Sequence, residues 1–217
     1  MRIEEPAVTT ERTEASWHSS AELLVLHGVR LAGFATVKAV AERADLPTNV
    51  VDNQLGVLEG QGLVEHMAFG DASGWILTAE GKERDTELLR EELIASGAES
   101  KLRGALDDFE NTVNADLVRV ITAWQLQSAA EQQSSSTAVL QELTELGEAL
   151  AKLLIPLTDR LPRFSRYPRQ FREALAQARS GDMHWVAGVG VLSCHTVWAE
   201  LHQDLLSSLG RERTTGT

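Results

Sequence analysis

Five arginines recur at every third position between residues 160 and 172, where their side chains could bind anions. They are Arg160, Arg163, Arg166, Arg169 and Arg172, with Phe164, Tyr167 and Phe171 between them. Guanidinium groups bind phosphates and carboxylates through two parallel hydrogen bonds. The run therefore predicts a site for an anionic ligand or a nucleic-acid backbone. It is equally compatible with arginines that pair with carboxylates of this acidic chain, including those of its first half.

Three tryptophans and two histidines in the second half of the chain indicate a mixed polar and apolar pocket. The candidate ligand-binding residues are Trp124, Trp185, His195, Trp198 and His202. We expect a small-molecule effector there, and the alternative is a core in which the imidazoles are hydrogen-bonded. His195 and His202 lie two helical turns apart, roughly 10 Å along the axis, too far to share a zinc ion at about 2 Å from each nitrogen. No metal and no cofactor are therefore expected.

Catalytic motifs are absent from the sequence. It has no glycine-rich phosphate loop, no nucleophile elbow and no HExxH. Glu200 and Asp204 are four residues apart and face away from the apolar stripe of their helix, so we expect both to be solvated. We expect no catalytic residues and expect that the protein is not an enzyme. The alternative is an enzyme that acts on a small molecule.

The elements that would position these residues begin with a helix-turn-helix. Apolar spacing predicts helices over residues 21–31 and 37–44, and a third that starts near Pro47 and stops at Gly60 or Gly62. Residues 63–68 and 75–77 read as strands around a turn at 69–74, and a helix follows over 79–95. This order is typical of a winged helix-turn-helix.

In that motif the third helix enters the major groove of double-stranded DNA and its outward residues contact base edges. Here those residues are Thr48, Asn49, Asp52 and Asn53. Across residues 36–80 the only basic side chains are Lys38 and Arg43. The module thus offers about two phosphate contacts per copy, and DNA binding would require cations from elsewhere, such as the arginine run.

Beyond Gly97 every apolar pattern has helical spacing. A polar segment at residues 131–136 is expected to break the helices, and Pro156, Pro162 and Pro168 to mark an irregular connection. The predicted fold is mainly α: a winged helix-turn-helix with a small β-hairpin, followed by an all-helical bundle. The predicted divisions are a mobile tail at 1–20, the winged helix with a linker helix at 21–95, and a dimerisation or ligand-sensing domain at 96–217.

Net charge and cysteine content limit the ligands and the cellular location that we expect. The 217 residues include 20 Lys and Arg against 32 Asp and Glu, a net charge of −12. A field of that sign repels phosphate backbones at long range. One cysteine, Cys194, allows no internal disulfide, and no signal peptide or long apolar run is evident. We expect a cytoplasmic protein that does not span a membrane.

Residues 41–58, 62–64 and 74–81 resemble the winged helix of MarR-like transcription regulators. The later segments GDMHW and HTVWAELHQDLL resemble helical regions that accompany winged helices in actinobacterial regulators. The resemblance implies a homodimeric DNA-binding transcriptional regulator with a helical effector and dimerisation domain. In such regulators the wing is commonly basic, whereas residues 69–74 contain no Lys or Arg. The alternative is a winged-helix module that binds a protein and not DNA.

Overall fold

The computed structural model describes residues 18–211 as a mainly α-helical protein with one two-stranded antiparallel sheet. The prediction of a mainly α chain with a single small hairpin is confirmed at this level. Residues 1–17 of the predicted mobile tail lie outside the described residues. Ser20, the last residue assigned to that tail, caps the first helix by accepting a hydrogen bond from the Leu23 backbone.

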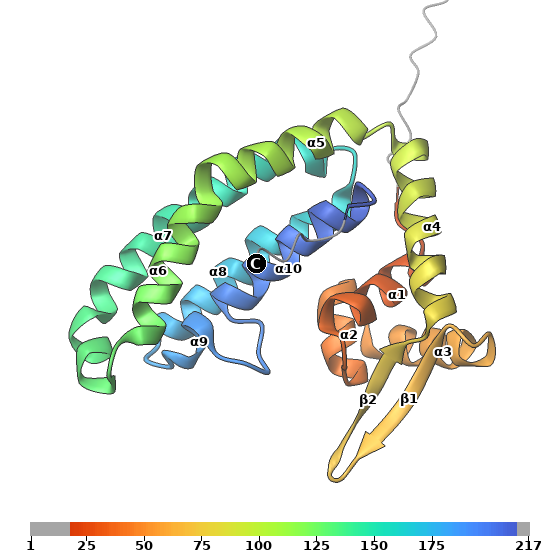
Figure 1. Cartoon of the computed structure of the whole chain (residues 1–217), viewed down its shortest axis with the longest axis horizontal. Coiled ribbons are helices and arrows are strands. Elements are labelled where there is room, and N and C mark those ends of the chain that lie inside the picture. The colour runs from red at the N-terminus through yellow and green to blue at the C-terminus, as the bar shows by residue number, and fades with distance from the viewer. Residues whose placement is uncertain (1–17, 212–217) are drawn as a thin grey trace, which may run out of the picture.

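The N-terminal half, residues 18–97, contains four helices and the hairpin (Figure 1). In chain order these are α1 (Ala21–Ala32), α2 (Val37–Ala44), α3 (Thr48–Gly60), β1 (Val64–Phe69), β2 (Ala72–Leu77) and α4 (Ala79–Ser96). Thr36 and Thr78 cap α2 and α4 by accepting backbone hydrogen bonds. Such hydroxyls satisfy amide groups that have no partner within the helix, which explains where both helices begin.

The hairpin is longer than the sequence predicts. Its strands pair from Val64 with Leu77 to Phe69 with Ala72, so only Gly70 and Asp71 form the turn. Gly70 has a φ of +57°, a conformation that glycine adopts without steric cost, and this allows so short a connection. The expected six-residue turn at 69–74 is therefore wrong.

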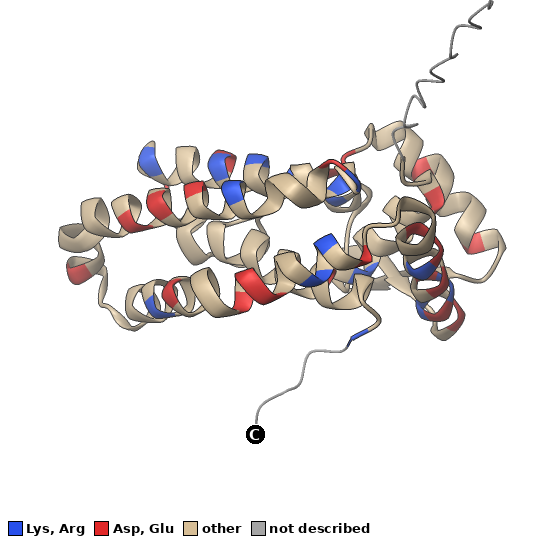
Figure 2. Ribbon diagram, turned by 90° about the horizontal axis from the view of Figure 1, so that it is seen from above, with Lys and Arg blue, Asp and Glu red and all other residues tan. Residues whose placement is uncertain are grey.

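The C-terminal half is helical throughout, apart from its loops. Its elements are α5 (Glu99–Asp108), a π-helical turn η1 (Phe109–Val113), α6 (Asn114–Leu126), α7 (Ala129–Thr158), a 3₁₀ turn η2 (Pro162–Ser165), α8 (Arg166–Arg179), α9 (His184–Ala187) and α10 (Cys194–Ser208). Helices α5 and α6 run along α7, and α10 lies between α8 and the N-terminal half (Figure 1). Basic and acidic residues are interspersed along these helices (Figure 2).

The predicted helix break at residues 131–136 is wrong, because these residues lie within α7. The break comes earlier, at Gln127 and Ser128. Ser128 accepts a hydrogen bond from the Glu131 backbone, and the Glu131 carboxylate accepts one from the Ser128 backbone. This capping box starts the helix immediately before the polar segment, whose side chains are exposed or half-buried within the helix.

The predicted irregular connection around the three prolines is also mostly helical. Pro156 lies inside α7 near its end, Pro162 is in the first turn of η2, and Pro168 is in the first turn of α8. Proline is tolerated in the first turn of a helix because its missing N–H would have no partner there. Most of the arginine run is consequently held on regular helix.

Two hydrophobic clusters underlie the fold, one formed by residues 23–89 and the other by residues 98–206. Between them, α1 and α4 of the N-terminal half pack against α10. None of the helices in residues 18–211 combines the length and apolar character needed to span a bilayer.

Candidate functional site

The outer face of α3 presents the four side chains that the sequence predicts to read DNA. Thr48, Asn49, Asp52 and Asn53 are all exposed. The opposite face is anchored in the N-terminal core by three fully buried side chains, Val51, Leu55 and Leu58. The apolar spacing of 4 and 3 residues thus sets which side of α3 faces solvent.

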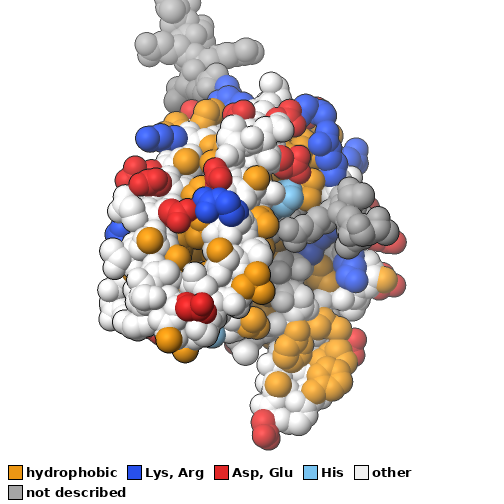
Figure 3. Space-filling view, turned by 60° about the vertical axis from the view of Figure 1, so that its left-hand side comes forward, with side chains coloured by type: hydrophobic (Ala, Val, Ile, Leu, Met, Phe, Trp, Pro, Cys, Tyr) orange, Lys and Arg blue, Asp and Glu red, His pale blue; other side chains and the backbone are white. Residues whose placement is uncertain are grey.

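Beside α3 the hairpin carries an exposed aromatic pair. Phe34, from the loop after α1, is 42% exposed, and Phe69, at the end of β1, is 63% exposed. Their ring centroids are 6.5 Å apart. Hydrophobic side chains gather on this projecting hairpin, and acidic atoms lie at its end (Figure 3).

Cations are scarce on this surface. The sequence has no Lys or Arg between Arg43 and Lys82. Arg43 itself turns toward the C-terminal half, where its guanidinium donates two hydrogen bonds, of 3.0 and 2.6 Å, to the Glu200 carboxylate. Lys38 is 82% exposed and lies 3.9 Å from Glu42. The surface formed by α3 and the hairpin is therefore polar, acidic and partly aromatic.

A buried ionic cluster joins the two halves around Asp204 of α10, which has no exposed surface. Its carboxylate accepts hydrogen bonds from Arg163 at 2.6 Å, Arg166 at 3.0 Å and the Tyr167 hydroxyl at 2.6 Å. The other members are His27, Asp85, Glu92 and Ser208. Arg163 also donates to Glu92 of α4 at 2.8 Å, which makes this arginine a direct link between the halves.

His27 of α1 lies between two buried carboxylates. Its Nδ1 is 3.2 Å from Asp85 Oδ1, and its Nε2 is 3.1 Å from Asp204 Oδ1. The Nε2 contact is not directed as a hydrogen bond, so we take the attraction to Asp204 to be mainly Coulombic. Burial alone would lower the pKa of His27, but the two carboxylates outweigh it and raise the pKa above its usual value.

The pKa values of two carboxylates in the cluster are shifted in the opposite direction, downward. Burial alone would raise the pKa of Asp204, yet Arg163, His27 and Arg166 hold that pKa well below its usual range. The pKa of Asp85 is likewise lowered, because His27 and Arg30 together outweigh burial. Both groups are therefore carboxylates at neutral pH, and the cluster is a set of buried, mutually compensated charges.

The arginine run divides into buried and exposed members. Arg163 and Arg166 are only 8% and 2% exposed and belong to the buried ionic cluster. Arg169 pairs with Asp45 of the N-terminal half at 2.7 Å. Arg160 and Arg172 are exposed. The structure thus does not gather the five guanidinium groups into one site, and Arg163, Arg166 and Arg169 pair with the protein's own carboxylates.

The expectation that Glu200 and Asp204 are solvated is wrong. Glu200 is 7% exposed and Asp204 is fully buried, because α10 is covered on that side by α1, α4 and α8. Burial raises the pKa of Glu200, and Arg43 and Arg166 oppose the rise. A helix can be amphipathic in sequence and still be covered on both faces, provided that its polar side meets charges of opposite sign.

The five residues predicted to bind an effector are not brought together in one pocket. Trp124, Trp198 and His202 are buried in the C-terminal core. Trp198 packs on Phe109 and donates through Nε1 to the Asn114 side chain at 3.1 Å. His202 Nε2 lies 3.0 Å from the Glu110 carboxylate. Trp185 and His195 line two different cavities.

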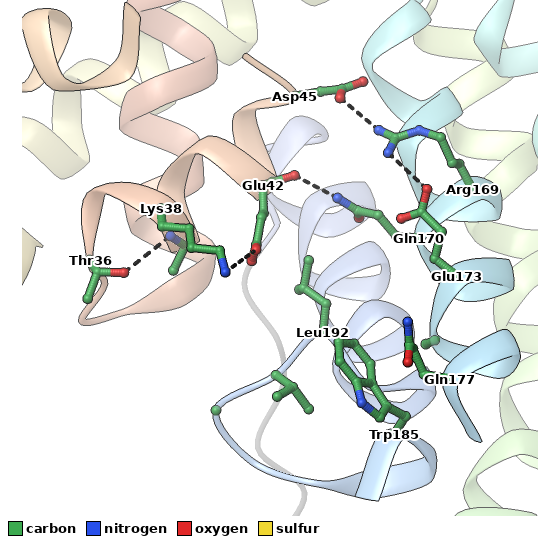
Figure 4. A pocket seen from close by; sticks show the side chains of 14 residues that line it. Thr36, Lys38, Glu42, Asp45, Arg169, Gln170, Glu173, Gln177, Trp185 and Leu192 are labelled. Atoms are coloured by element: carbon green, nitrogen blue, oxygen red, sulfur yellow. Dashed lines mark hydrogen bonds and ion pairs between the residues drawn. The ribbon is translucent and has the colours of Figure 1, made fainter. Parts of the chain in front are cut away.

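These two cavities lie between the halves, on either side of the loop that precedes α10. The larger, about 800 Å³, is lined by Arg30, Arg43, His195 and Glu200, among others. The second, about 560 Å³, is formed between α2 and α8 and includes Trp185 (Figure 4). We call it the Trp185 pocket. Both volumes fall in the range of small-molecule sites, about 300–1,000 Å³.

Sequence reasoning missed three titratable members of the buried ionic cluster, namely His27, Asp85 and Glu92. His27 stands inside the apolar stretch of α1, and Asp85 and Glu92 are seven residues apart on the face of α4 that also buries Leu88 and Leu89. Charged residues on a buried helical face were therefore a detectable signal.

Within residues 18–211 no group of three or more His, Cys, Asp or Glu side chains has the arrangement of a metal site. Comparisons of the chain with protein families, with curated proteins and with solved structures found no match.

Proposed function

We propose that residues 21–96 act as a winged helix-turn-helix and that the protein is a DNA-binding transcriptional regulator. The observation that carries the proposal is the orientation of α3: Thr48, Asn49, Asp52 and Asn53 are exposed together on its outer face, while the inner face is buried. The hairpin packs next to this helix and would serve as the wing. A homodimer would present two such helices to successive major grooves, about 34 Å apart.

Recognition in this proposal depends on base edges more than on phosphates. Asn49 and Asn53 can each pair with adenine through two hydrogen bonds, and Thr48 can donate or accept. Arg43 is committed to Glu200, and Arg163 and Arg166 are buried. The arginine run therefore does not supply the contacts to phosphates, and Lys38 is the most accessible cation near α3. We expect weak non-specific binding and a shallow salt dependence, with a slope of about −2 for a dimer.

The test is selection of bound duplexes from fragmented genomic DNA at about 50 mM salt, followed by titration of the selected sequence at rising salt. Asn53→Ala should cost about 1–3 kcal/mol on the selected sequence, as loss of a bidentate base contact does. Asn111→Ala, which removes an exposed asparagine of η1, is the matched control and should bind like the unmodified chain. Failure to retain any duplex at this low salt would reject the proposal.

A second candidate function, binding of a protein partner, is favoured by the aromatic pair on the hairpin. Phe34 and Phe69 are exposed side by side, and the cation-free stretch between Arg43 and Lys82 suits a basic partner better than a phosphate backbone. Phe69→Ser separates the two functions. It should abolish capture of such a partner while leaving Asn53-dependent duplex binding in place.

A further inference from the structure

The Trp185 pocket has walls from both halves of the molecule. Thr36, Lys38 and Glu42 reach it from the N-terminal half, and Arg169, Glu173 and Gln177 come from α8. The Gln170 side chain donates to the Glu42 backbone carbonyl at 2.7 Å, which joins the two walls of the pocket. Its volume of about 560 Å³ suits a ligand of small-molecule size.

One side of the pocket is aromatic and apolar. The indole of Trp185 lies beside Leu192, and Ala39, Ala174 and Val191 complete the apolar lining. Figure 4 shows the tryptophan ring between Leu192 and Gln177, below the carboxylates of Glu42 and Glu173. The face of an indole ring carries negative electrostatic potential and attracts cations.

The carboxylates that line the Trp185 pocket are incompletely neutralised. Arg169 lies 2.7 Å from Asp45 but 3.4 Å from Glu173. Lys38 reaches Glu42 only at 3.9 Å, and its side chain is 82% exposed. The close ion pair is therefore Arg169 with Asp45, while Glu42 and Glu173 keep long contacts that a better-placed cation can replace.

We propose that the Trp185 pocket binds a small organic ammonium ion that carries an apolar or aromatic group. The ammonium would be attracted by the carboxylates of Glu42 and Glu173, and its apolar part would pack on Trp185 and Leu192. An anionic ligand fits poorly, because the lining has three carboxylates, Glu42, Asp45 and Glu173, against two cations. The protein's net charge of −12 also concentrates cations near its surface and repels anions.

A ligand in this pocket bridges the halves, because Glu42 belongs to α2 and Glu173 to α8. It would therefore influence the angle at which α3 is presented, and in this respect the inference rests on the proposed regulatory function. Binding itself is independent of DNA and is measured on the free full-length protein. If the protein retains no DNA duplex, the proposed ammonium site is unaffected. If it binds no ammonium ion, the proposal of DNA binding is unaffected.

Isothermal titration calorimetry with three ligands of similar shape tests the chemistry. They are phenethylammonium, neutral phenethyl alcohol and anionic phenylacetate. We expect the ammonium to bind one site per chain, the alcohol to bind at least about tenfold more weakly, since it loses both the charge–carboxylate and the cation–π attraction, and phenylacetate not to bind. Equal binding of the ammonium and the alcohol, or no binding of the ammonium at millimolar concentration, would overturn the proposal.

Variants locate the site. Glu173→Gln should weaken phenethylammonium about fivefold, the upper range for an accessible ion pair, and Trp185→Leu should weaken it by a similar factor through loss of the cation–π contact. Glu83→Gln changes the net charge equally but lies on the exposed face of α4, and should bind as the unmodified chain does. If Glu83→Gln and Glu173→Gln weaken binding equally, the ligand responds to the overall charge and the pocket is not its site. Glu173 is exposed and its contacts are long, so its substitution tests the site even if Trp185→Leu does not fold.

Discussion

At the scale of single residues, His27 has the most unusual surroundings in the described chain. It is 2% exposed and is flanked by Asp85 and Asp204, which raise its pKa despite the opposing effect of burial. Arg30, Arg163 and Arg166 neutralise the same two carboxylates. Protonated His27 thus adds a further cation to a cluster that already holds three arginines, and its loss weakens but does not dismantle the cluster.

The stabilising effect of His27 should depend on pH. Because its folded pKa is raised, the contribution is complete below the unfolded value of about 6.5 and is lost as pH rises through the folded pKa. His27→Gln should therefore lower the free energy of unfolding most near pH 6. The difference from the unmodified chain should shrink as pH rises through the raised pKa of folded His27. Urea unfolding at several pH values measures this difference, and a gap that stays constant or grows with pH would show that His27 acts as a neutral side chain.

The titration of Asp85 and Asp204 does not interfere with the measurement of this pH dependence. Their pKa values are lowered in the folded state, so their contribution is complete above the unfolded value of about 3.9 and is lost only as pH falls below it. The two titrations therefore affect stability in separate windows, one below about pH 3.9 and one above about pH 6.5.

At the scale of elements, the start of α4 is fixed by its approach to the chain segment before β1. Gly81 packs on Leu63, and a Cβ at this position would lie 1.9 Å from the Leu63 carbonyl oxygen. Thr78 strengthens the same junction by donating to the Gly62 carbonyl at 2.7 Å. A side chain at position 81 would have to push α4 away from the hairpin, and with it the exposed aromatic pair.

Gly81→Ala should destabilise the protein by about 1–3 kcal/mol, as overpacking of a close backbone contact does. Gly104→Ala is the matched control, since Gly104 lies in α5 with nothing within 4 Å of its added Cβ. That substitution should stabilise by about 0.5–1 kcal/mol, because alanine favours helix over glycine. Thermal unfolding of both variants measures the two effects, and similar shifts in both would contradict the packing argument.

At the scale of the whole molecule, two hydrophobic cores are joined by charges. The N-terminal and C-terminal clusters are separate, and the contacts between halves include the buried ionic cluster, the Arg43–Glu200 pair and the Arg169–Asp45 pair. Removing one partner from a buried set of charges typically costs 3–5 kcal/mol, because the others stay desolvated without compensation. The unfolding of one half should therefore be linked to that of the other.

We expect the unmodified chain to unfold in a single calorimetric transition and Asp204→Asn to unfold in two, with the first at lower temperature. Asn keeps the size of the side chain but removes the Asp204 carboxylate from Arg166 and leaves Arg163 paired with Glu92. Asp107→Asn, at an exposed position of α5, should retain the single transition. Two transitions in the unmodified chain would mean that the ionic cluster does not couple the halves.

Local pattern was enough to predict much of this protein. The order of three helices, a hairpin and a fourth helix, and the exposed face of α3, follow from apolar spacing and turn residues, both of which act within a few residues. The spacing of Ser128 and Glu131 was an equally local signal, because it is that of a capping box. Interpreting the polar residues 131–136 as a helix break was an error.

Tertiary structure alone decided the partners of the charged side chains. Arg163 with Glu92 and Arg43 with Glu200 are separated by 71 and 157 residues in the chain, and no spacing rule relates such positions. The same sequence of arginines could have formed an open anion site. Arg163 and Arg166 instead neutralise buried carboxylates, because packing α10 between α8 and the N-terminal half excludes water from both of its faces, and a desolvated charge is stable only beside an opposite one.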